Sequence, residues 1–347
     1  MERETAPAAL RYQALIGVGG IGVGRFFALS GSHTLGREES RSGRFLESRD
    51  YCKLHIISHY VHTLSGSDFH TIMIGRLGDD DWGLALFDEM RRSGLDLRYV
   101  TLAPGEQTLF GLCLVYPDGS GGNLMVSDSA CSRVDQGCVR RAAPEFERYA
   151  GYGIALAVPE VPLDTRLYLL QTAVQHRFFR ASSLTSEEIR TDIAAQIISL
   201  SNLLAINLDE AAALVDAAAS SPSAVIVEKS VLHLTDMNKH ILISITGGRQ
   251  GSWFWDGQDI RHMPALEVPV IASAGAGDAH LAGILTGLAA GLPLPDTLEL
   301  ARLVAAQSLT SAHTIHPDTT RETLFQLMQD LLPEVPHGVA RFLNPKA

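Results

Sequence analysis

Four consecutive residues in the last third of the chain, Gly275-Ala276-Gly277-Asp278, have the types and order needed to handle a phosphate. The apolar stretch that follows, 281–290, predicts a helix that starts at this turn. Small residues at a helix start let backbone N–H groups converge on an anion, which the helix dipole also attracts. A carboxylate at the same place has a purpose if it accepts the proton of a hydroxyl that attacks the phosphate.

We therefore predict that Asp278 is the general base of a phosphoryl transfer. Gly275, Ala276 and Gly277 are predicted to form the anion hole, because their N–H groups would stabilise charge on the phosphoryl oxygens. A positive φ is expected at Gly277, where a branched side chain would resist the turn and block the approach of the phosphate.

A second pair of polar residues, Asn207 and Glu210, lies one helical turn apart at a predicted strand-to-helix junction. These oxygens have the chemistry to orient Mg²⁺ through its waters. The same spacing is also that of a helix N-cap with a capping-box glutamate, which needs no metal. Both interpretations stay open from these two residues alone.

The sequence does not support two other nucleotide-binding motifs. Residues 17–22 read G-x-G-x-x-G after a predicted strand, which is the dinucleotide-binding pattern. The apolar strand that should end in an acid about 20 residues later is replaced by the polar stretch 33–49. A P-loop is excluded because G-x-x-x-x-G-K-[ST] does not occur.

Composition narrows the class of protein. The formal net charge of -11 over 347 residues argues against nucleic-acid or anionic-membrane partners. No apolar run reaches the roughly 18–20 residues of a membrane span, and residues 1–7 lack the apolar core of a secretory signal. The 4 cysteines show no paired spacing, so neither zinc nor disulfides are indicated. We expect a cytoplasmic enzyme with a small-molecule substrate.

The elements that must position these residues alternate between strands and helices. Strands are predicted at 12–18, 71–74, 109–116, 167–171, 203–206, 224–228 and 241–246. Helices are predicted at 53–64, 82–93, 187–199, 210–219 and 281–290. This alternation predicts an α/β fold with a mostly parallel sheet, helices on both faces, and ligands at the carboxyl ends of the strands.

Four motifs occur in an order that resembles the ribokinase, or PfkB, family of carbohydrate kinases: Gly75–Gly83, Asn207–Glu210, Thr246–Gly251 and Gly275–Asp278. The resemblance implies a three-layer fold with a mostly parallel central sheet and a small β lid. It also implies an enzyme that transfers the γ-phosphate of ATP to a hydroxyl of a sugar or sugar-like molecule, with Mg²⁺. In this pattern the three aspartates at 79–81 belong to a structural turn.

The resemblance also assigns a nucleotide site. Thr246, Gly247, Gly248 and Gly251 would form its strand and turn, although a plain turn between two strands would look the same. The helix at 300–310 and the loop at 311–317 would form the other wall, with Gln307 and His313 as candidate ligands.

The predicted domain covers residues 1–335, with lid segments at about 19–50 and 103–130 and a C-terminal tail at 336–347. Residues 117–119 are predicted to end a lid strand with a turn. The apolar strand at 109–116 could pair with its twin in a homodimer through the lid.

The chain departs from the family where the acceptor should bind. The expected Asp after the first strand is absent from 19–24, and the expected Gly-Gly and Asn are replaced within 50–55. Lys53, His55, Glu39 and Arg41 are candidate substrate ligands, and a solvated loop would have much the same composition. The family often has Asp at the position of Ala272, so dependence on a monovalent cation is in doubt.

Two alternatives to a sugar kinase stay open. The stretch 308–318 is similar to nucleoside-type members such as pseudouridine kinases, so the acceptor could be a nucleoside. The missing sugar ligands would also fit a non-catalytic ligand sensor, since fold alone does not fix function. The retained Asp278 argues against the sensor, which has no need of a base.

Overall fold

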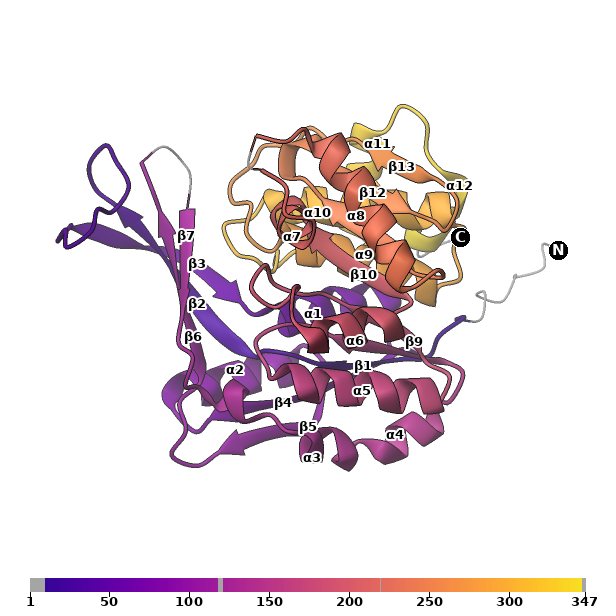
Figure 1. Ribbon diagram of the computed structural model, residues 1–347, viewed down its shortest axis with the longest axis horizontal. Coiled ribbons are helices and arrows are strands. Elements are labelled where there is room, and N and C mark those ends of the chain that lie inside the picture. The colour runs from indigo at the N-terminus through magenta and orange to yellow at the C-terminus, as the bar shows by residue number, and fades with distance from the viewer. Residues whose placement is uncertain (1–9, 118–120, 219, 345–347) are drawn as a thin grey trace.

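A nine-stranded sheet lies at the centre of the computed structural model, which describes residues 10–117, 121–218 and 220–344 (Figure 1). The strand order is β13-β12-β11-β10-β9-β8-β1-β4-β5, and all neighbours are parallel except β11–β12 and β12–β13. The predicted mostly parallel sheet is confirmed. The strands are β1 (Ala14–Val18), β4 (His70–Gly78), β5 (Asp96–Ala103), β8 (Gly153–Ala157), β9 (Phe179–Ser182), β10 (Leu203–Asn207), β11 (Leu242–Thr246), β12 (Ser252–Trp255) and β13 (Ile260–Met263).

Helices cover both faces of this sheet and bury a separate apolar cluster on each side. One face carries α1 (Lys53–Ser65), α2 (Asp81–Arg92), α9 (Ala276–Ala289), α10 (Leu294–Leu309), α11 (Arg321–Leu331) and α12 (His337–Leu343). The other face carries α3 (Gln136–Arg141), α4 (Ala143–Arg148), α5 (Leu163–Gln175), α6 (Asp192–Leu200), α7 (Leu208–Leu214) and α8 (Ser223–Met237). Two short 3-10 turns, η1 (Ala130–Arg133) and η2 (Gly248–Gln250), complete the set.

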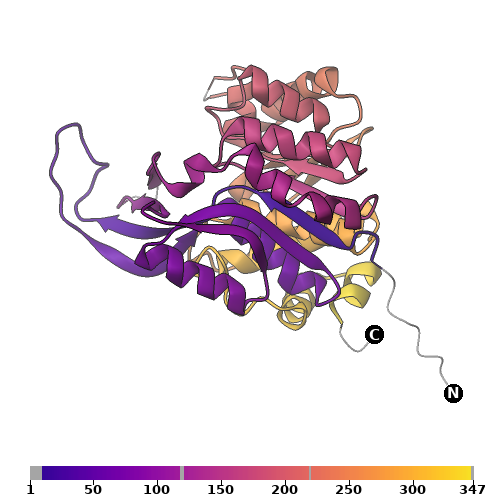
Figure 2. The same cartoon turned by 90° about the horizontal axis from the view of Figure 1, so that it is seen from below.

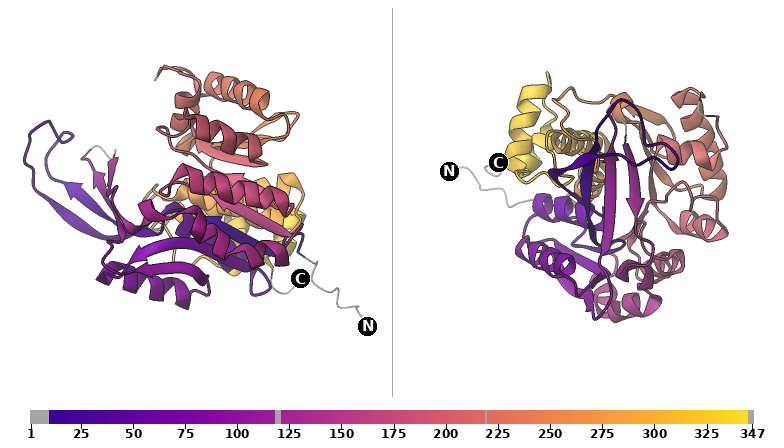
Figure 3. Two further views of the ribbon diagram at one scale, coloured as in Figure 1. Left: turned by 60° about the horizontal axis from the view of Figure 1, so that its bottom comes forward. Right: turned by 90° about the vertical axis from the view of Figure 1, so that its left-hand side faces the viewer.

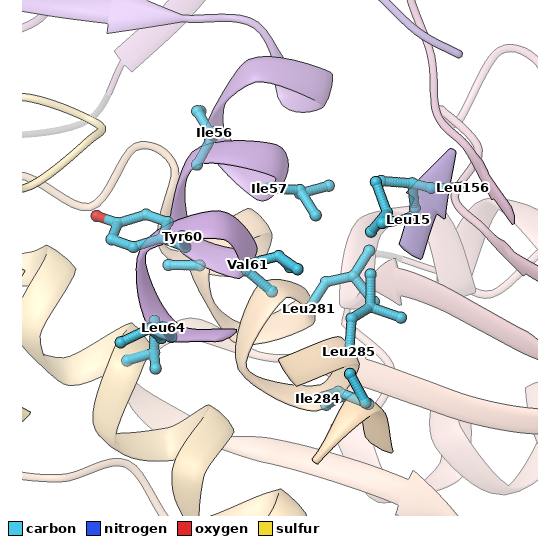
Figure 4. Packing of buried hydrophobic residues seen from close by; sticks show 14 of the residues in the cluster. Leu15, Ile56, Ile57, Tyr60, Val61, Leu64, Leu156, Leu281, Ile284 and Leu285 are labelled. Atoms are coloured by element: carbon cyan, nitrogen blue, oxygen red, sulfur yellow. The ribbon is translucent and has the colours of Figure 1, made fainter. Parts of the chain in front are cut away.

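The packing of α1 against α9 holds together the two helices that matter most for the site. Figure 4 shows Ile57 and Val61 of α1 facing Leu281 and Leu285 of α9, beside Leu15 of β1. All five side chains are almost completely buried. Burying each such side chain contributes about 1.5–3 kcal/mol, so the starts of both helices are held in fixed relative positions.

Two predicted strands turn out to be helical, and both predictions were wrong for the same reason. Residues 224–228 lie in α8, where Ile226, Val227 and Leu234 face the core. Residues 167–171 lie in α5, where Leu169 and Leu170 are buried. Short apolar runs fit a buried strand or one face of a helix equally well, and only the longer pattern separates them.

A second sheet of four strands, the lid sheet, projects from the carboxyl edge of the central sheet (Figures 1 and 2). Its order is β3-β2-β6-β7, with β2 and β6 parallel and the outer pairs antiparallel. Figure 3 shows the β2–β3 hairpin extending away from the rest of the molecule. The strands are β2 (Gly22–Leu29), β3 (Gly43–Tyr51), β6 (Leu109–Val115) and β7 (Gly121–Met125).

These strands lie mainly within the two segments expected to form the lid, and their opening and closing remains a prediction. The glycine-rich segment 17–22 leads from β1 into β2. A dinucleotide site would need a helix at that point, so the competing motif is not supported. Of the turn expected at 117–119, residues 118 and 119 lie outside the described residues.

The C-terminal segment differs from the predicted tail. Residues 337–343 form α12, and its Val339 and Leu343 are fully buried against the core on the α1 side of the sheet. This segment is therefore packed on the domain, while residues 1–9 and 345–347 lie outside the described part. Among the described residues, no helix is both long and apolar enough to cross a membrane.

The predicted structural turn at the start of α2 is confirmed. Asp80 caps the helix by accepting a hydrogen bond from the Gly83 N–H at 2.8 Å. The same carboxylate accepts hydrogen bonds from the Thr108 N–H and hydroxyl, at 2.8 and 2.6 Å. Asp80 therefore links α2 to the start of the lid strand β6, and both of its carboxylate oxygens accept hydrogen bonds there.

Candidate active site

The residues that can do chemistry gather at the carboxyl ends of the parallel strands, where open α/β sheets bind their ligands. Asn207 and Thr246 are the last residues of β10 and β11, and Glu160 follows β8 after a short turn. Lys53 is the first residue of α1, and Asp278 lies in the first turn of α9. Topology thus brings together positions that are up to 225 residues apart.

The glycine turn at the start of α9 combines a left-handed N-cap residue with open space at the helix N-terminus. Gly275 is the N-cap of this helix of 14 residues and adopts φ +79°, which L side chains rarely reach. A Cβ atom on Gly275 would lie 2.8 Å from Thr314 Cβ. A Cβ atom on Gly277 would meet only Thr246 Oγ1, at 3.6 Å.

The expectation of a positive φ at Gly277 was therefore wrong, because the left-handed residue is Gly275. The two glycines serve different purposes. Gly275 lets the chain turn beneath the loop that contains Thr314, whereas Gly277 leaves open space in front of the helix start.

Lys53 and Asp278 form an ion pair in this site, with Lys53 Nζ 3.2 Å from Asp278 Oδ1. Both side chains are mostly shielded, with 31% and 14% of their surface exposed. The Asp278 carboxylate raises the pKa of Lys53, helped by Glu210 and Glu160 and opposed by burial. Lys53 therefore stays charged at every physiological pH and holds the carboxylate in one position.

Three further carboxyl groups surround this pair. Burial raises the pKa of Glu160 to about 7, although the Lys53 ammonium pulls in the other direction. Burial also raises the pKa of Glu210 and of Asp50, with Lys53 again lowering that of Glu210. The Lys53 ammonium group thus interacts with several carboxyl groups in this site.

Asn207 and Glu210 form the capping box that their spacing allowed. The Glu210 N–H donates to Asn207 Oδ1 at 2.8 Å, and the Asn207 N–H donates to Glu210 Oε2 at 2.8 Å. Their structural role is thereby established, and it leaves the carboxylate of Glu210 within electrostatic reach of Lys53. A role in orienting Mg²⁺ stays a prediction.

The residues predicted to bind a nucleotide lie in two places, at the end of β11 with the turn that follows it, and on the side of α10. Thr246 lies beside Gly277, and Gly247, Gly248 and Gly251 form the turn from β11 to β12, in which Gly248 and Gly251 have positive φ. Gln307 is buried in α10 and donates to Thr323 Oγ1 at 3.0 Å. Nucleotide contact by these residues stays a prediction.

His313 and Thr314 tie the lid sheet to the glycine turn. The Arg49 N–H of β3 donates to His313 Nδ1 at 3.0 Å, and the Thr314 N–H donates to the Arg49 carbonyl at 3.2 Å. The Tyr51 N–H donates to Thr314 Oγ1 at 3.0 Å. Since Thr314 also packs against Gly275, the same residue supports both the lid strand β3 and the glycine turn.

The candidate substrate ligands are not gathered in one place. Lys53 is at the centre of the site, whereas His55 is only 1% exposed, with its ring against that of Tyr51. Glu39 and Arg41 lie in the loop between β2 and β3, at the end of the lid furthest from the central sheet (Figure 1). Substrate contact by these residues stays a prediction, and only Lys53 lies beside Asp278.

Sequence reasoning missed Glu160 and Thr314. The signal for Glu160 was available, because a charged residue directly after the buried strand β8 occupies the edge where ligands collect. A second sign appears only in the structure, where Glu160 has φ 78°, an unusual value for a residue other than glycine. Thr314 carries no sequence signal of this kind, since its role comes from tertiary contacts alone.

The amino-acid sequence also matches a known protein family. The family model described as pfkB family carbohydrate kinase matches residues 61–321, which is well over half of the chain. The chain belongs to the pfkB family of carbohydrate kinases. A ribokinase of Schizosaccharomyces pombe is 24% identical over 242 residues, covering 69% of this chain and 74% of the relative.

Solved structures show the same fold. A ribokinase from Cryptococcus neoformans in complex with ADP superposes with a TM-score of 0.74 at 19% identity, covering 91% of this chain and 99% of the other. A nucleoside kinase from Burkholderia thailandensis in complex with inosine superposes with a TM-score of 0.75 at 19% identity, covering 93% and 100%. The predicted ribokinase-like architecture, with a central and a smaller sheet, is confirmed.

Proposed function

We propose that this pfkB-family kinase transfers the γ-phosphate of ATP to a hydroxyl of a sugar or sugar-like small molecule. The observation that carries the proposal is the placement of Asp278, paired with Lys53, in the first turn of α9 beside an open glycine turn. The proposed base thus lies in the first turn of the helix whose start forms the proposed anion site, so that a hydroxyl held by Asp278 would face a phosphate bound at the glycine turn.

In the proposed reaction, Asp278 accepts the proton of the acceptor hydroxyl as its oxygen attacks the γ-phosphorus. The bond between that phosphorus and the bridging oxygen of ADP breaks, and ADP leaves. The N–H groups at Gly275, Ala276 and Gly277 stabilise the charge on the phosphoryl oxygens. Lys53 orients Asp278 and lies where it can donate to the acceptor oxygen.

The residues present are compatible with Mg²⁺ held through water. Glu210 and Asn207 supply oxygens at the strand edge, and burial leaves the Glu210 carboxyl poorly solvated, which favours a nearby cation. Among the described residues no group of three or more His, Cys, Asp or Glu forms a metal cage. Mg²⁺ bound by waters, one carboxylate and phosphates needs no such cage, and it would neutralise phosphate charge when present.

Nucleosides form the second acceptor class that we consider. The fold likeness to a nucleoside kinase in complex with inosine favours their inclusion in any substrate panel. A non-catalytic sensor is not favoured, because the chain belongs to a kinase family and keeps an acid and an anion turn side by side. At the position where relatives often carry Asp, Ala272 has no side-chain oxygen to offer, so we propose no requirement for a monovalent cation.

ATP consumption with Mg²⁺ against sugars, polyols and nucleosides tests the proposal, with wild type beside Asp278→Asn. We expect the variant to bind ATP and melt like wild type but to turn over about 10²-fold more slowly or worse, because the base is lost. Asp259→Asn, an exposed position in the β12–β13 turn, is the matched control and should keep full activity. Turnover by Asp278→Asn close to that of wild type would remove Asp278 from its proposed role.

We further propose that the lid sheet pairs two copies of the chain. Both of its edge strands, β3 and β7, carry exposed large apolar side chains, and an apolar edge strand is a ready site for pairing with another chain.

A further inference from the structure

We propose that the acceptor is a neutral or cationic polyhydroxy compound, and that Asp50 of the lid strand β3 is a specificity-determining residue that excludes acceptors with a carboxylate or phosphate. This inference rests on the proposed function and deepens it. It specifies the charge of the acceptor, whereas the proposed function specifies that Asp278 acts as the base.

The carboxylate of Asp50 lies over the neighbouring strand β2. Asp50 is paired with Gly24, and a Cβ atom on Gly24 would lie 2.8 Å from Asp50 Oδ2. Any side chain at position 24 would therefore displace the carboxylate. On the next strand, Gly24 is paired with Gly111, so Asp50 lies beside two adjacent positions that have no side chain.

Asp50 points to the face of the lid sheet opposite α2. Its neighbours Arg49 and Tyr51 both contact Glu89 of α2, at 3.0 and 2.5 Å, so they occupy the α2 face. Successive side chains of a strand point to opposite faces, which places Asp50 on the other one. Asp50 and Asp278 are close enough for their charges to interact.

The donors around the Asp50 carboxylate are a thiol, a backbone N–H and a hydroxyl, none of which carries a positive charge. Its Oδ2 lies 3.1 Å from the thiol sulfur of Cys113, which is a weak donor. The N–H of Tyr51 and the hydroxyl of Thr314 also stabilise its charged form. No Lys or Arg in the described part of the chain forms an ion pair with it. An ionised carboxylate so placed gains from further hydroxyl or ammonium donors.

Glu160 gives independent support for a ligand in the same space. Its Oε2 atom is buried and has no hydrogen-bond partner, although the Cys52 thiol lies near the carboxyl. Across the described residues, Lys53 is the only cation that forms an ion pair with any of the four site carboxylates, which are Asp50, Glu160, Glu210 and Asp278. Lys53 already has Asp278 as its partner.

The charge balance determines what can enter. Acceptor hydroxyls and ammonium groups can donate to Asp50 and to the unpartnered Oε2 atom of Glu160. A carboxylate or phosphate on the acceptor cannot donate, and the negative charge of Asp50 would repel it in a site that is shielded from water. The same site therefore favours uncharged and amino-substituted polyols over sugar acids and sugar phosphates.

The test compares sets of acceptors that differ in charge but share a skeleton. Glucose, glucosamine and glucuronate form one set, and ribose, ribonate and ribose 5-phosphate form another, with inosine as a neutral nucleoside. Direct binding is measured by calorimetry without ATP, and kcat/KM is measured with ATP and Mg²⁺. For wild type we expect binding and turnover only with neutral or cationic members, at least 10-fold better than with any anion.

Asp50→Asn, which keeps the size of the side chain, should lower this preference at least 10-fold while the melting temperature stays near that of wild type. Glu47→Gln is the control on the same strand, because Glu47 is exposed and should leave the preference unchanged. Anionic members that bind or react as well as their neutral counterparts would overturn the proposal, as would a set in which no neutral or cationic member binds. An unchanged preference in Asp50→Asn would remove Asp50 from it.

The two proposals fail in different ways. Binding with the expected charge preference but no phosphate transfer to any acceptor would contradict the kinase function and leave the charge rule standing. Phosphate transfer to sugar acids as efficient as transfer to neutral sugars would support the kinase function and contradict the charge preference.

Discussion

Two glycines of the anion turn, only two positions apart, differ in what a side chain would do. Gly275→Ala forces an L residue to φ +79° and brings its Cβ to 2.8 Å from Thr314 Cβ. We expect this change to cost about 1–2 kcal/mol or more of unfolding free energy, and therefore to lower the melting temperature.

Gly277→Val should weaken ATP binding and leave the stability of the fold nearly unchanged. Its Cβ would meet only Thr246 Oγ1, at 3.6 Å, so the fold should tolerate it, while the branched side chain occupies the space in front of the N–H groups. We expect ATP affinity by calorimetry to fall at least 10-fold with little change in melting temperature. Equal loss of stability in both variants would contradict this division of roles.

For individual residues, the sequence predicts a role correctly where that role depends on neighbours along the chain. The capping box of Asn207 and Glu210 and the helix start before Asp278 both come from local spacing, and the structure contains both. The partnership of Lys53 with Asp278 and the support of Gly275 by Thr314 could not be predicted this way. They join segments far apart in sequence, whose approach depends on the packing of α1, α9 and the loop at 311–317.

Among the elements, α1 carries an acid-sensitive group of histidines. Burial lowers the pKa of His55 to about 3 and that of His59 to about 4, with charge repulsion between neighbouring histidines adding to each shift. Unfolded histidine titrates near pH 6.5, so the unfolded chain takes up protons first as the pH falls. The stability that comes from keeping these rings neutral is complete above pH 6.5 and is lost from there downward.

We predict that His55→Gln reduces the pH dependence of stability. Between pH 7.5 and 5.5 wild type should lose about 1 kcal/mol more unfolding free energy than the variant, because one buried titrating ring has been removed. Urea unfolding at the two pH values measures this difference. His240→Gln, at an exposed position, should behave like wild type, and parallel curves for His55→Gln and wild type would show that His55 is not buried and neutral.

The elements that were predicted correctly are those with a distinct period or clear end signals. The first turn of α2 has its capping aspartate, and α1 follows a long helical pattern. The segments in α5 and α8 were misread because a run of four apolar residues carries too little periodicity, and the β-branched residues of 224–228 favour a strand by themselves. Tertiary packing on the sheet overrides that local preference.

For the whole molecule, the exposed side chains of the lid sheet allow the proposed dimer to be tested. Phe45 on β3 and Leu124 on β7 are 48% and 60% exposed, and both strands are edges of the sheet. We expect wild type to sediment as a dimer at micromolar concentration and the double variant Phe45→Glu, Leu124→Lys to sediment as a monomer with an unchanged melting temperature. Leu232→Lys, at an apolar position on α8 that is 67% exposed, is the control and should leave the assembly unchanged. A wild-type monomer would contradict the prediction.

The strand β3 has two ends with different freedom to change during evolution. At one end Tyr51 is separated from Lys53 of α1 by a single residue, so an insertion there would rotate or shift the ammonium group away from Asp278. At the other end, β3 enters the exposed loop at 30–42, which is anchored to no other element in the described structure. Insertions and deletions among orthologues should therefore accumulate in this loop and be absent between residues 49 and 53, so that the family can lengthen its hairpin without losing the register of the site.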